Sequence, residues 1–246
     1  MNPTCCTAIN ADTGRFFSRV ASLHRLLHRL FGFERTQRQL IEGLRGGGIA
    51  GAELLEIGSG AGYLQRALLR EGAVRAIGVD LSERMLRIAR EEAAREGLTD
   101  RISHRQGDFT LLADQIPHAD VTILDKVICC YPDWERLVGR SLAKTRRLYA
   151  FTIPRDRPLV RAGLRLMRWG LNRAGCCYQP FIHDPAQIEA RVAASGFRRI
   201  YEAHTTSWVT QVYSREAQVS GRGELTAMAS APPQRTNMGQ SRSLPP

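Results

Sequence analysis

The sequence predicts a doubly wound α/β fold, in which helices cover both faces of a mostly parallel β-sheet. Apolar runs typical of buried strands alternate with helical patterns five times, and a last helix and two strands follow. The first strand ends in a glycine-rich turn over residues 58–62, and the second strand ends in Asp80. Strand ends of this kind are where open α/β sheets bind their ligands, so the sequence predicts a ligand site there.

The composition fits one domain with appendages, because the chain has 246 residues and 43% of them are hydrophobic. No apolar run approaches the ~20 residues that a membrane span needs, and we expect a cytoplasmic protein. The net charge of +11 suits nucleic acid, an anionic membrane surface or an acidic small substrate as a partner. A GC-rich genome would explain the arginine content equally well, so charge alone does not choose among these partners.

Residues 1–45 are predicted to form a helical lid, after a polar and loose start over 1–13. The first helix begins at Gly14 and places five apolar side chains on the face that we expect to pack on the domain: Phe16, Val20, Leu23, Leu27 and Leu30. Its arginines lie largely off that face. Residues 15–31 therefore also fit a helix that lies on anionic lipid, or an Arg-rich targeting segment.

A second helix is expected over residues 32–44. Three of its side chains are candidates to cover the ligand: Phe33, Arg35 and Gln39. In the first helix, His24 and His28 are one turn apart. We expect these two histidines to be solvated, because no third residue suggests a shared metal.

The turn after the first strand, residues 53–57, carries the clearest chemical indication. Glycine is required where a ligand lies against bare backbone, or where a turn needs torsion angles that a Cβ opposes. Asp80 comes about twenty residues after the glycines, where a carboxylate can accept hydrogen bonds from both hydroxyls of a ribose. A nicotinamide fingerprint would place its third glycine at residue 63, whereas this chain has Gly62 and Tyr63.

The pattern E-x-G-x-G-x-G over residues 56–62, with Asp80 downstream, resembles motif I of the class I S-adenosylmethionine (SAM) methyltransferases. The resemblance implies SAM as the cofactor, with its amino-acid end beside the glycine loop. It also implies a Rossmann-like, seven-stranded sheet of order 3-2-1-4-5-7-6 whose last strand is antiparallel. The cofactor-binding residues that it implies are Glu56, Gly58, Ser59, Gly60, Gly62, Asp80, Leu81, Asp108, Phe109 and Asp125.

The following segments continue the alternation. A helix over 83–97, capped by Ser82, precedes a strand over 102–106. The Gly-Asp-Phe turn at 107–109 resembles the corner that binds adenine in the family, where the Asp accepts a hydrogen bond from the exocyclic amine and the next residue covers the ring.

A continuous apolar run over 119–125 predicts a buried central strand with Asp125 at the ligand edge. The next helix is predicted to have Pro132 in its first turn, and a strand over 147–153 follows. These elements complete the central part of a methyltransferase domain expected over residues 46–216.

Residues 157–180 are predicted to form a helical insertion after the fifth strand. The segment contains five arginines and no acidic residue, and four of the arginines fall on one helix face. That edge is either solvated or part of a cap whose arginines bind substrate carboxylates or phosphates. The candidate substrate-binding residues are Arg157, Arg161 and Arg165.

The C-terminal part is predicted to contain a helix that Asp184 caps and that ends at Ser195. Two strands follow, over 197–201 and 205–213, and residues 217–246 are expected to be a disordered tail because they have little apolar content.

The six cysteines form three adjacent pairs: Cys5-Cys6, Cys129-Cys130 and Cys176-Cys177. Neighbouring Cα atoms lie ~3.8 Å apart, which is closer than the ~4.4–6.8 Å of an ordinary disulfide. We therefore expect reduced thiols, as in a cytosolic protein. No spacing of Cys and His indicates zinc, and no metal site is predicted.

The sequence thus predicts an enzyme that transfers a methyl group from SAM to a small-molecule acceptor, at a carboxylate or a hydroxyl oxygen. The later motifs resemble more loosely the magnesium-protoporphyrin O-methyltransferases, in which a histidine commonly precedes a Tyr-Pro pair. Here Cys130 precedes Tyr131. Tyr131 and Asp125 are the candidate catalytic residues, and the arginines of the insertion suit an anionic acceptor.

Two other hypotheses stay open. The charge favours an RNA or protein methyltransferase, but no N-P-P-Y-type motif follows the fourth strand and no separate RNA-binding module is visible, so nucleic acid is not the expected partner. The second is a non-catalytic subunit or membrane-associated module with a SAM-binding fold. The intact glycine and acidic positions count against it.

Overall fold

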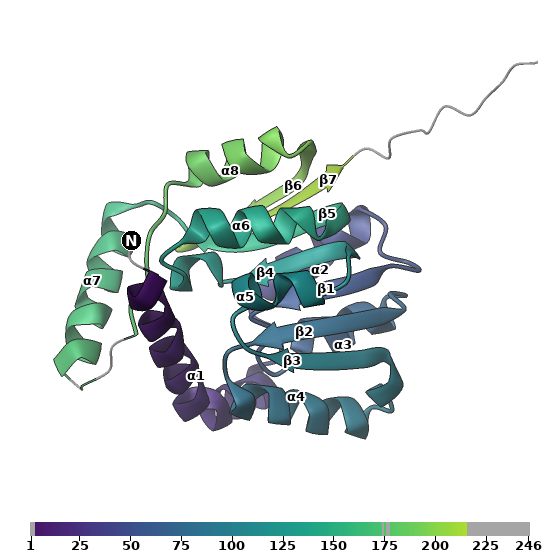
Figure 1. Cartoon of the computed structure of the whole chain (residues 1–246), viewed down its shortest axis with the longest axis horizontal. Coiled ribbons are helices and arrows are strands. Elements are labelled where there is room, and N and C mark those ends of the chain that lie inside the picture. Colours follow the sequence, from purple (N-terminus) through teal and green to yellow (C-terminus); the bar gives the residue numbers. More distant parts are fainter. Residues whose placement is uncertain (1–2, 174, 176–177, 216–246) are drawn as a thin grey trace, which may run out of the picture.

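The computed structural model describes residues 3–173, 175 and 178–215, which form a seven-stranded sheet between layers of helices (Figure 1). The strand order is β3-β2-β1-β4-β5-β7-β6, which confirms the order that the resemblance implies. Strands β1 to β5 pair in parallel, and β7 is antiparallel to both of its neighbours.

Strands and helices alternate along the chain as predicted. The strands are β1 (Glu53–Ile57), β2 (Arg75–Asp80), β3 (Ile102–Gln106), β4 (Ala119–Asp125), β5 (Thr145–Pro154), β6 (Phe197–His204) and β7 (Trp208–Arg215). The α-helices of the described residues are α1 (Pro3–Phe31), α2 (Arg35–Gly46), α3 (Tyr63–Arg70), α4 (Glu83–Arg95), α5 (Phe109–Leu112), α6 (Trp134–Ala143), α7 (Pro158–Arg173) and α8 (Pro185–Ala194). Short 3₁₀ helices are η1 (Thr99–Arg101), η2 (Ala113–Gln115) and η3 (Ile128–Cys130).

The central strands build two apolar cores, one on each face of the sheet. Successive side chains of a strand point to opposite faces, so Leu54 of β1 joins one core and Leu55 joins the other. Helices α2, α3 and α4 close the core that contains Leu54, and α6 and α8 close the core that contains Leu55. Strands buried on both faces explain why the sequence shows continuous apolar runs rather than alternation.

Helix α1 differs from its prediction in extent and in orientation. It begins at Pro3, so the expectation of a loose segment up to residue 13 is wrong. The apolar face predicted to pack on the domain does so at Phe16, which stacks on Tyr178, but not further along the helix, where Leu23, Leu27 and Leu30 are exposed. The opposite side packs inward, where Ala21 is fully buried.

Charges on α4 explain this orientation of α1. Arg25 bonds to Glu91 at 3.0 Å and to Glu92 at 2.6 Å. The hydroxyl of Ser18 lies 2.7 Å from that of Ser82, the N-cap of α4. Because α4 presents carboxylates, α1 turns its polar and basic side toward α4 and leaves its leucines outside.

The two histidines of α1 lie on this inner side. The ring of His28 stacks on Tyr63 with centroids 3.5 Å apart, and that of His24 lies 5.8 Å from the same ring. Burial lowers the pKa of both imidazoles. The prediction of a solvated pair is therefore wrong, because Tyr63 provides an apolar surface that the sequence spacing does not reveal.

Two later segments need smaller corrections. Asp133 is the N-cap of α6, so Pro132 precedes the helix rather than lying in its first turn. The insertion does form a helix, α7, but none of its residues is buried. The tail predicted to be disordered, residues 217–246, lies outside the described residues.

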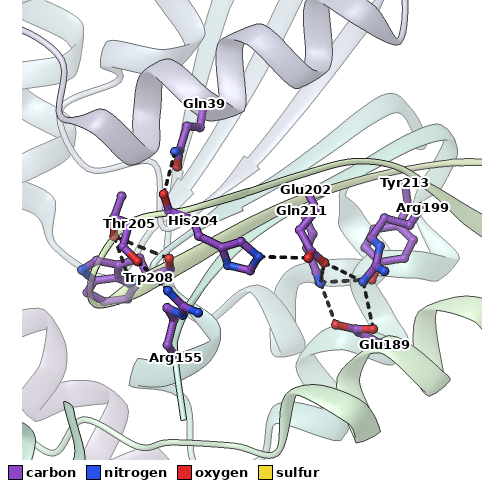
Figure 2. A network of polar contacts seen from close by, with 10 residues as sticks. All are labelled: Gln39, Arg155, Glu189, Arg199, Glu202, His204, Thr205, Trp208, Gln211 and Tyr213. Carbon is purple, nitrogen blue, oxygen red and sulfur yellow. Dashed lines mark hydrogen bonds and ion pairs between the residues drawn. The ribbon is translucent and has the colours of Figure 1, made fainter. Parts of the chain in front are cut away.

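Strand β6 runs three residues further than predicted, and β7 begins at Trp208 rather than at residue 205, because a tight turn occupies the residues between them. The backbone N–H of Thr205 donates to the carbonyl of Trp208 at 2.9 Å, and the Thr205 hydroxyl accepts from the N–H of Trp208 at 3.0 Å. Gln39 of α2 donates its amide to the carbonyl of His204 at 3.3 Å, as Figure 2 shows. Gln39 therefore supports this turn instead of covering a ligand.

A polar network attaches α8 to the same strands (Figure 2). The buried amide of Gln211 donates to Glu189 of α8 at 2.6 Å and to Glu202 of β6 at 2.7 Å. Arg199 bonds to the same two carboxylates, at 3.1 Å and 2.6 Å. The antiparallel end of the sheet is thus fixed by charge-assisted hydrogen bonds as well as by apolar packing.

We predict that Gly43→Ala destabilises the fold. A Cβ at Gly43 would lie 2.7 Å from both the Tyr201 ring and Val212, where α2 packs on β6 and β7. Overpacking of this kind costs about 1–3 kcal/mol of unfolding free energy, measured by denaturant titration. Gly46→Ala in the same helix is the control, since its Cβ would meet nothing within 4 Å. Equal effects of both substitutions would contradict the prediction.

Candidate active site

A cavity of about 340 Å³ lies at the carboxyl ends of β1, β2 and β4. Its volume is in the range of small-molecule sites, roughly 300–1,000 Å³. Among the sequence-predicted residues, the cavity is lined by Glu56, Gly58, Ser59, Gly60, Asp80, Leu81, Asp108, Phe109, Asp125 and Tyr131. Gly62 is not in the lining; it adopts a left-handed conformation as the N-cap of α3 and so shapes the turn.

Gly58 occupies a position that no other residue could fill without movement. Its φ is +67°, and a Cβ would lie 2.4 Å from a methyl group of Val127, which follows β4. The loops after β1 and β4 therefore approach each other closely, and the cavity wall is bare backbone at this point.

Asp80 holds two segments of the cavity wall together. Its Oδ2 accepts a hydrogen bond from the N–H of Gly60 at 2.8 Å, and its Oδ1 accepts one from the N–H of Ser82 at 2.8 Å. Burial raises the pKa of Asp80 above its usual range, while these hydrogen bonds act in the opposite direction. A carboxylate has about four lone-pair sites, so both oxygens can still accept from a ligand.

Three carboxyl groups share the cavity: Glu56, which is buried, and Asp80 and Asp125, which are half-buried. Burial raises the pKa of Glu56 well above its usual range, and the charges of Asp125 and Asp80 raise it further. Oε2 of Glu56 and Oδ1 of Asp125 have no hydrogen-bond partner among the described residues. An acidic, partly unsatisfied pocket of this kind favours a ligand that is cationic and donates hydrogen bonds.

The corner predicted to bind adenine is closed by Asp108. Its Oδ1 accepts from the N–H of Thr110 at 2.8 Å, and the hydroxyl of Tyr131 donates to the carboxylate at 2.7 Å. Asn10 of α1 donates its side-chain amide to Oδ2 at 2.8 Å. Burial raises the pKa of Tyr131, so its hydroxyl stays protonated and acts as a donor. A catalytic role for Tyr131 stays a prediction.

Side chains of α1 and α2 cover the cavity, but not those proposed from sequence. Gln37 donates to Oδ2 of Asp125 at 3.4 Å, and Glu34 forms an ion pair with Lys126. Further lining residues that sequence reasoning missed are Thr13, Phe17, His24, Tyr63, Met85 and Cys130. The sequence feature that could have drawn attention to Gln37 is its position three residues after Glu34, with which it forms a capping box.

Lys126 is in the left-handed region, with a φ of +58°, directly after the last residue of β4. Backbone strain of this kind in a non-glycine residue costs of order 1–3 kcal/mol and concentrates at functional sites. The conformation turns the chain sharply at the cavity edge, and the Lys126 ammonium group lies 5.3 Å from the centre of the Trp208 ring.

The predicted substrate arginines do not line this cavity. Arg161 and Arg165 line a second cleft of about 610 Å³ between α7 and residues 180–184, together with Arg168 and His183. Arg161 is paired with Asp156 there, and Arg157 is exposed and outside both cavities. The two cavities are neighbours, because the Nε2–H of His183 in the cleft donates to the carbonyl of Tyr131, a residue of the first cavity, at 3.0 Å.

Cys129 and Cys130 are buried free thiols, as expected for this pair. Their sulfur atoms lie 3.8 Å apart, and Sγ of Cys130 lies 3.0 Å from the hydroxyl of Tyr178. Cys176 and Cys177 lie outside the described residues, as do the side chains of Cys5 and Cys6.

Within the described part of the chain, no group of His, Cys, Asp and Glu could hold a metal ion, and no helix is long and apolar enough to cross a membrane.

A family model for the methyltransferase domain matches residues 54–147. A ubiquinone biosynthesis O-methyltransferase of Sinorhizobium medicae is 30% identical over 187 residues, which cover 72% of this chain and 69% of the relative. The chain belongs to the class I SAM-dependent methyltransferases. Its cofactor is therefore SAM, and the cavity carries the cradle and the unsatisfied acceptor atoms that such a ligand requires.

Other methyltransferases are similar to this chain over a smaller share of their length, or share only its fold. A ribosomal protein L11 methyltransferase of Erwinia tasmaniensis is 35% identical over 89 residues, so the match spans 35% of this chain and only 30% of that relative. Magnesium protoporphyrin IX methyltransferase of Synechocystis PCC 6803, crystallised with S-adenosylhomocysteine (SAH), has a TM-score of 0.61 at 19% identity. That comparison covers 74% of this methyltransferase and 82% of the Synechocystis chain, and it shows the shared fold.

We predict opposite effects of Glu56→Gln on stability and on SAM binding. In the wild type the folded-state pKa of Glu56 is raised, so the ligand-free fold loses stability as pH rises above the unfolded value, about 4.3. Glu56→Gln should remove this loss and raise the unfolding free energy at neutral pH by at least about 1 kcal/mol. SAM should bind about tenfold more weakly, because a charge-assisted hydrogen bond is lost.

Denaturant titrations at several pH values and calorimetry with SAM measure the two effects. Glu53→Gln is the matched control, since Glu53 lies on the same strand but is half-exposed and paired with Arg146 at 3.4 Å. A flat pH dependence in the wild type, or a loss of stability in Glu56→Gln, would show that burial of Glu56 is not the controlling effect.

Proposed function

We propose that this protein transfers the methyl group of SAM to an oxygen atom of an anionic small molecule. The observation that carries the proposal is the arrangement of two neighbouring cavities of opposite charge. The acidic cavity suits SAM, and the cleft lined by arginines suits a carboxylate or phosphate on the acceptor. His183 of the cleft hydrogen-bonds to the carbonyl of Tyr131, whose residue lines the acidic cavity, so the two sites are adjacent.

The cofactor roles follow from the free acceptor positions in the acidic cavity. Asp80 would accept hydrogen bonds from the ribose hydroxyls, and Asp108 and Phe109 would contact the adenine. Glu56, with its unpartnered Oε2, would bind the amino-acid end beside the backbone of Gly58. Asn10 and Tyr131 already donate to Asp108, so an adenine amine would join or replace one of these donors.

When bound, SAM supplies an electrophilic methyl group on a sulfonium ion. The protein then has to position the acceptor oxygen in line with that group and exclude water. A carboxylate acceptor is already ionised at neutral pH and needs no base. For a hydroxyl acceptor, the unpartnered Oδ1 of Asp125 would accept the proton, and burial raises the pKa of this carboxyl group toward that of a base.

Lengths of the matches to relatives support an O-methyltransferase over the alternatives. Alignments to two ubiquinone biosynthesis O-methyltransferases extend over 186–187 positions and cover 72–73% of this chain, and alignments to three others extend over 111 positions, whereas those to ribosomal protein L11 methyltransferases end after 71–89. Acceptor-binding segments lie outside the SAM-binding half in this fold, so the longer match is the more informative one. A protein substrate, an RNA substrate and a non-catalytic role remain the competing hypotheses.

We predict that Asp80→Ala abolishes SAM binding. The substitution removes the acceptors for two ribose hydroxyls, each worth about 1.5–3 kcal/mol, so the dissociation constant should rise by at least about 100-fold. Calorimetry with SAM and with SAH measures this. Asp100→Ala, an exposed substitution in η1, is the control. Unchanged affinity in a folded Asp80→Ala variant would sink the cofactor assignment.

We predict that substitutions in the arginine-lined cleft weaken binding of the acceptor without weakening binding of SAM. Arg165→Gln with Arg168→Gln should raise the KM for the acceptor about tenfold, because charge-assisted hydrogen bonds are lost, without changing the SAM dissociation constant. Labelled SAM, incubated with cell extract, identifies the acceptor by the mass of the product. Arg75→Gln with Arg105→Gln, at exposed positions of β2 and β3, controls for net charge. An unaltered KM in the cleft variant would reject the anionic-acceptor proposal.

A further inference from the structure

Helices α1 and α7 expose bulky apolar side chains that the SAM site does not use. On α1 they are Leu23, Leu26, Leu27, Leu30 and Phe31, which are between 45% and 76% exposed. On α7 they are Leu159 at 86%, Leu166 at 67% and Trp169 at 57%. We call these side chains the α1–α7 patch. Within each helix the exposed side chains recur mostly at spacings of three, four or seven residues and so share a face, and clusters of this kind mark interaction sites, whereas isolated exposed leucines are common.

The two helices lie along the same edge of the molecule. Figure 1 shows α1 and α7 beyond the arrowheads of the strands, at the edge where the acidic cavity lies. Their inner sides belong to one apolar cluster, to which Phe16 of α1 and Leu171 of α7 contribute. The ring of Phe16 stacks on Tyr178, which follows α7, with centroids 4.5 Å apart.

Basic residues accompany the patch. Arg19 lies on the outer side of α1, one turn before Leu23, and α7 carries several exposed arginines and no acidic residue. Arg173 lies with its guanidinium 5.0 Å from the centre of the exposed Trp169 ring. Arg25 and Arg29 are paired with carboxylates of α4 and contribute less.

We propose that the α1–α7 patch binds the surface of a lipid bilayer rich in anionic headgroups. Leucine, phenylalanine and tryptophan side chains would enter the boundary between headgroups and acyl chains, and the arginines would contact the headgroups. The chain has a net charge of +11, which complements an anionic surface. Within the described residues no helix is long and apolar enough to cross a membrane, so the proposed contact is with the bilayer surface.

Charge argues against the other occupants. A second copy of this chain would bring the same arginines to the interface, and like charges oppose such pairing. Nucleic acid would satisfy the arginines through its phosphates, but it would leave the exposed leucines in water. A bilayer surface is the partner that satisfies both kinds of side chain.

Cosedimentation with vesicles tests the proposal, which does not depend on the identity of the methyl acceptor. The full-length protein should bind vesicles of phosphatidylcholine mixed with phosphatidylglycerol, and bind phosphatidylcholine alone weakly. Leu23→Ser with Leu30→Ser, and separately Leu159→Ser with Leu166→Ser, should each lower the partition coefficient at least about tenfold, because two buried leucines are lost. Arg19→Gln should lower it about fivefold.

Leu111→Ser is the matched control, since Leu111 is 58% exposed but lies on α5. Thermal unfolding and calorimetry with SAM establish that each variant is folded and binds its cofactor. Absence of wild-type binding to anionic vesicles overturns the proposal, and so does a loss in Leu111→Ser equal to that in the patch variants. Patch-dependent dimerisation in light scattering, or patch-dependent binding of RNA, without vesicle binding would assign the surface to those partners instead.

Discussion

The three carboxyl groups that meet at one edge of the sheet are the constraint on which the rest of the site depends. Glu56, Asp80 and Asp125 come from β1, β2 and β4, and the parallel register of these strands brings the three side chains into one cavity. Removing several carboxylates from water costs free energy unless a cation or hydrogen-bond donors compensate. Two apolar cores and the close packing of Gly58 on Val127 hold the strands in place against this cost.

Local pattern and parallel-sheet geometry were enough to predict this half of the molecule. The glycine turn, Asp80 and Asp108 each lie at or just after the carboxyl end of a strand, so their placement needs no knowledge of the remaining chain. The strand order was implied by the family resemblance and is confirmed. The left-handed backbone of Lys126 was not predicted, because it depends on the turn after β4 rather than on the residue type.

The orientation of α1 could not be predicted from its own sequence. Two faces of the helix are apolar enough to pack, and the choice between them depends on Glu91 and Glu92, which lie far along the chain on α4. The contact of Asn10 with Asp108 likewise joins two residues that lie far apart in the sequence. For the acceptor side, α7 lacks any buried residue, so periodicity gives no packing face from which to place its arginines. Long-range pairing, rather than local propensity, decides these positions.

Helix α1 is one continuous element of 29 residues, roughly 40 Å long at 1.5 Å per residue. Its first half covers the cavity through Thr13 and Phe17, and its second half carries the exposed leucines. An unbroken helix of this length behaves as a lever, because a displacement at one end is transmitted to the other. The proposed docking of the second half would therefore be energetically linked to exchange of the cofactor beneath the first half, and such a linkage acts equally in both directions.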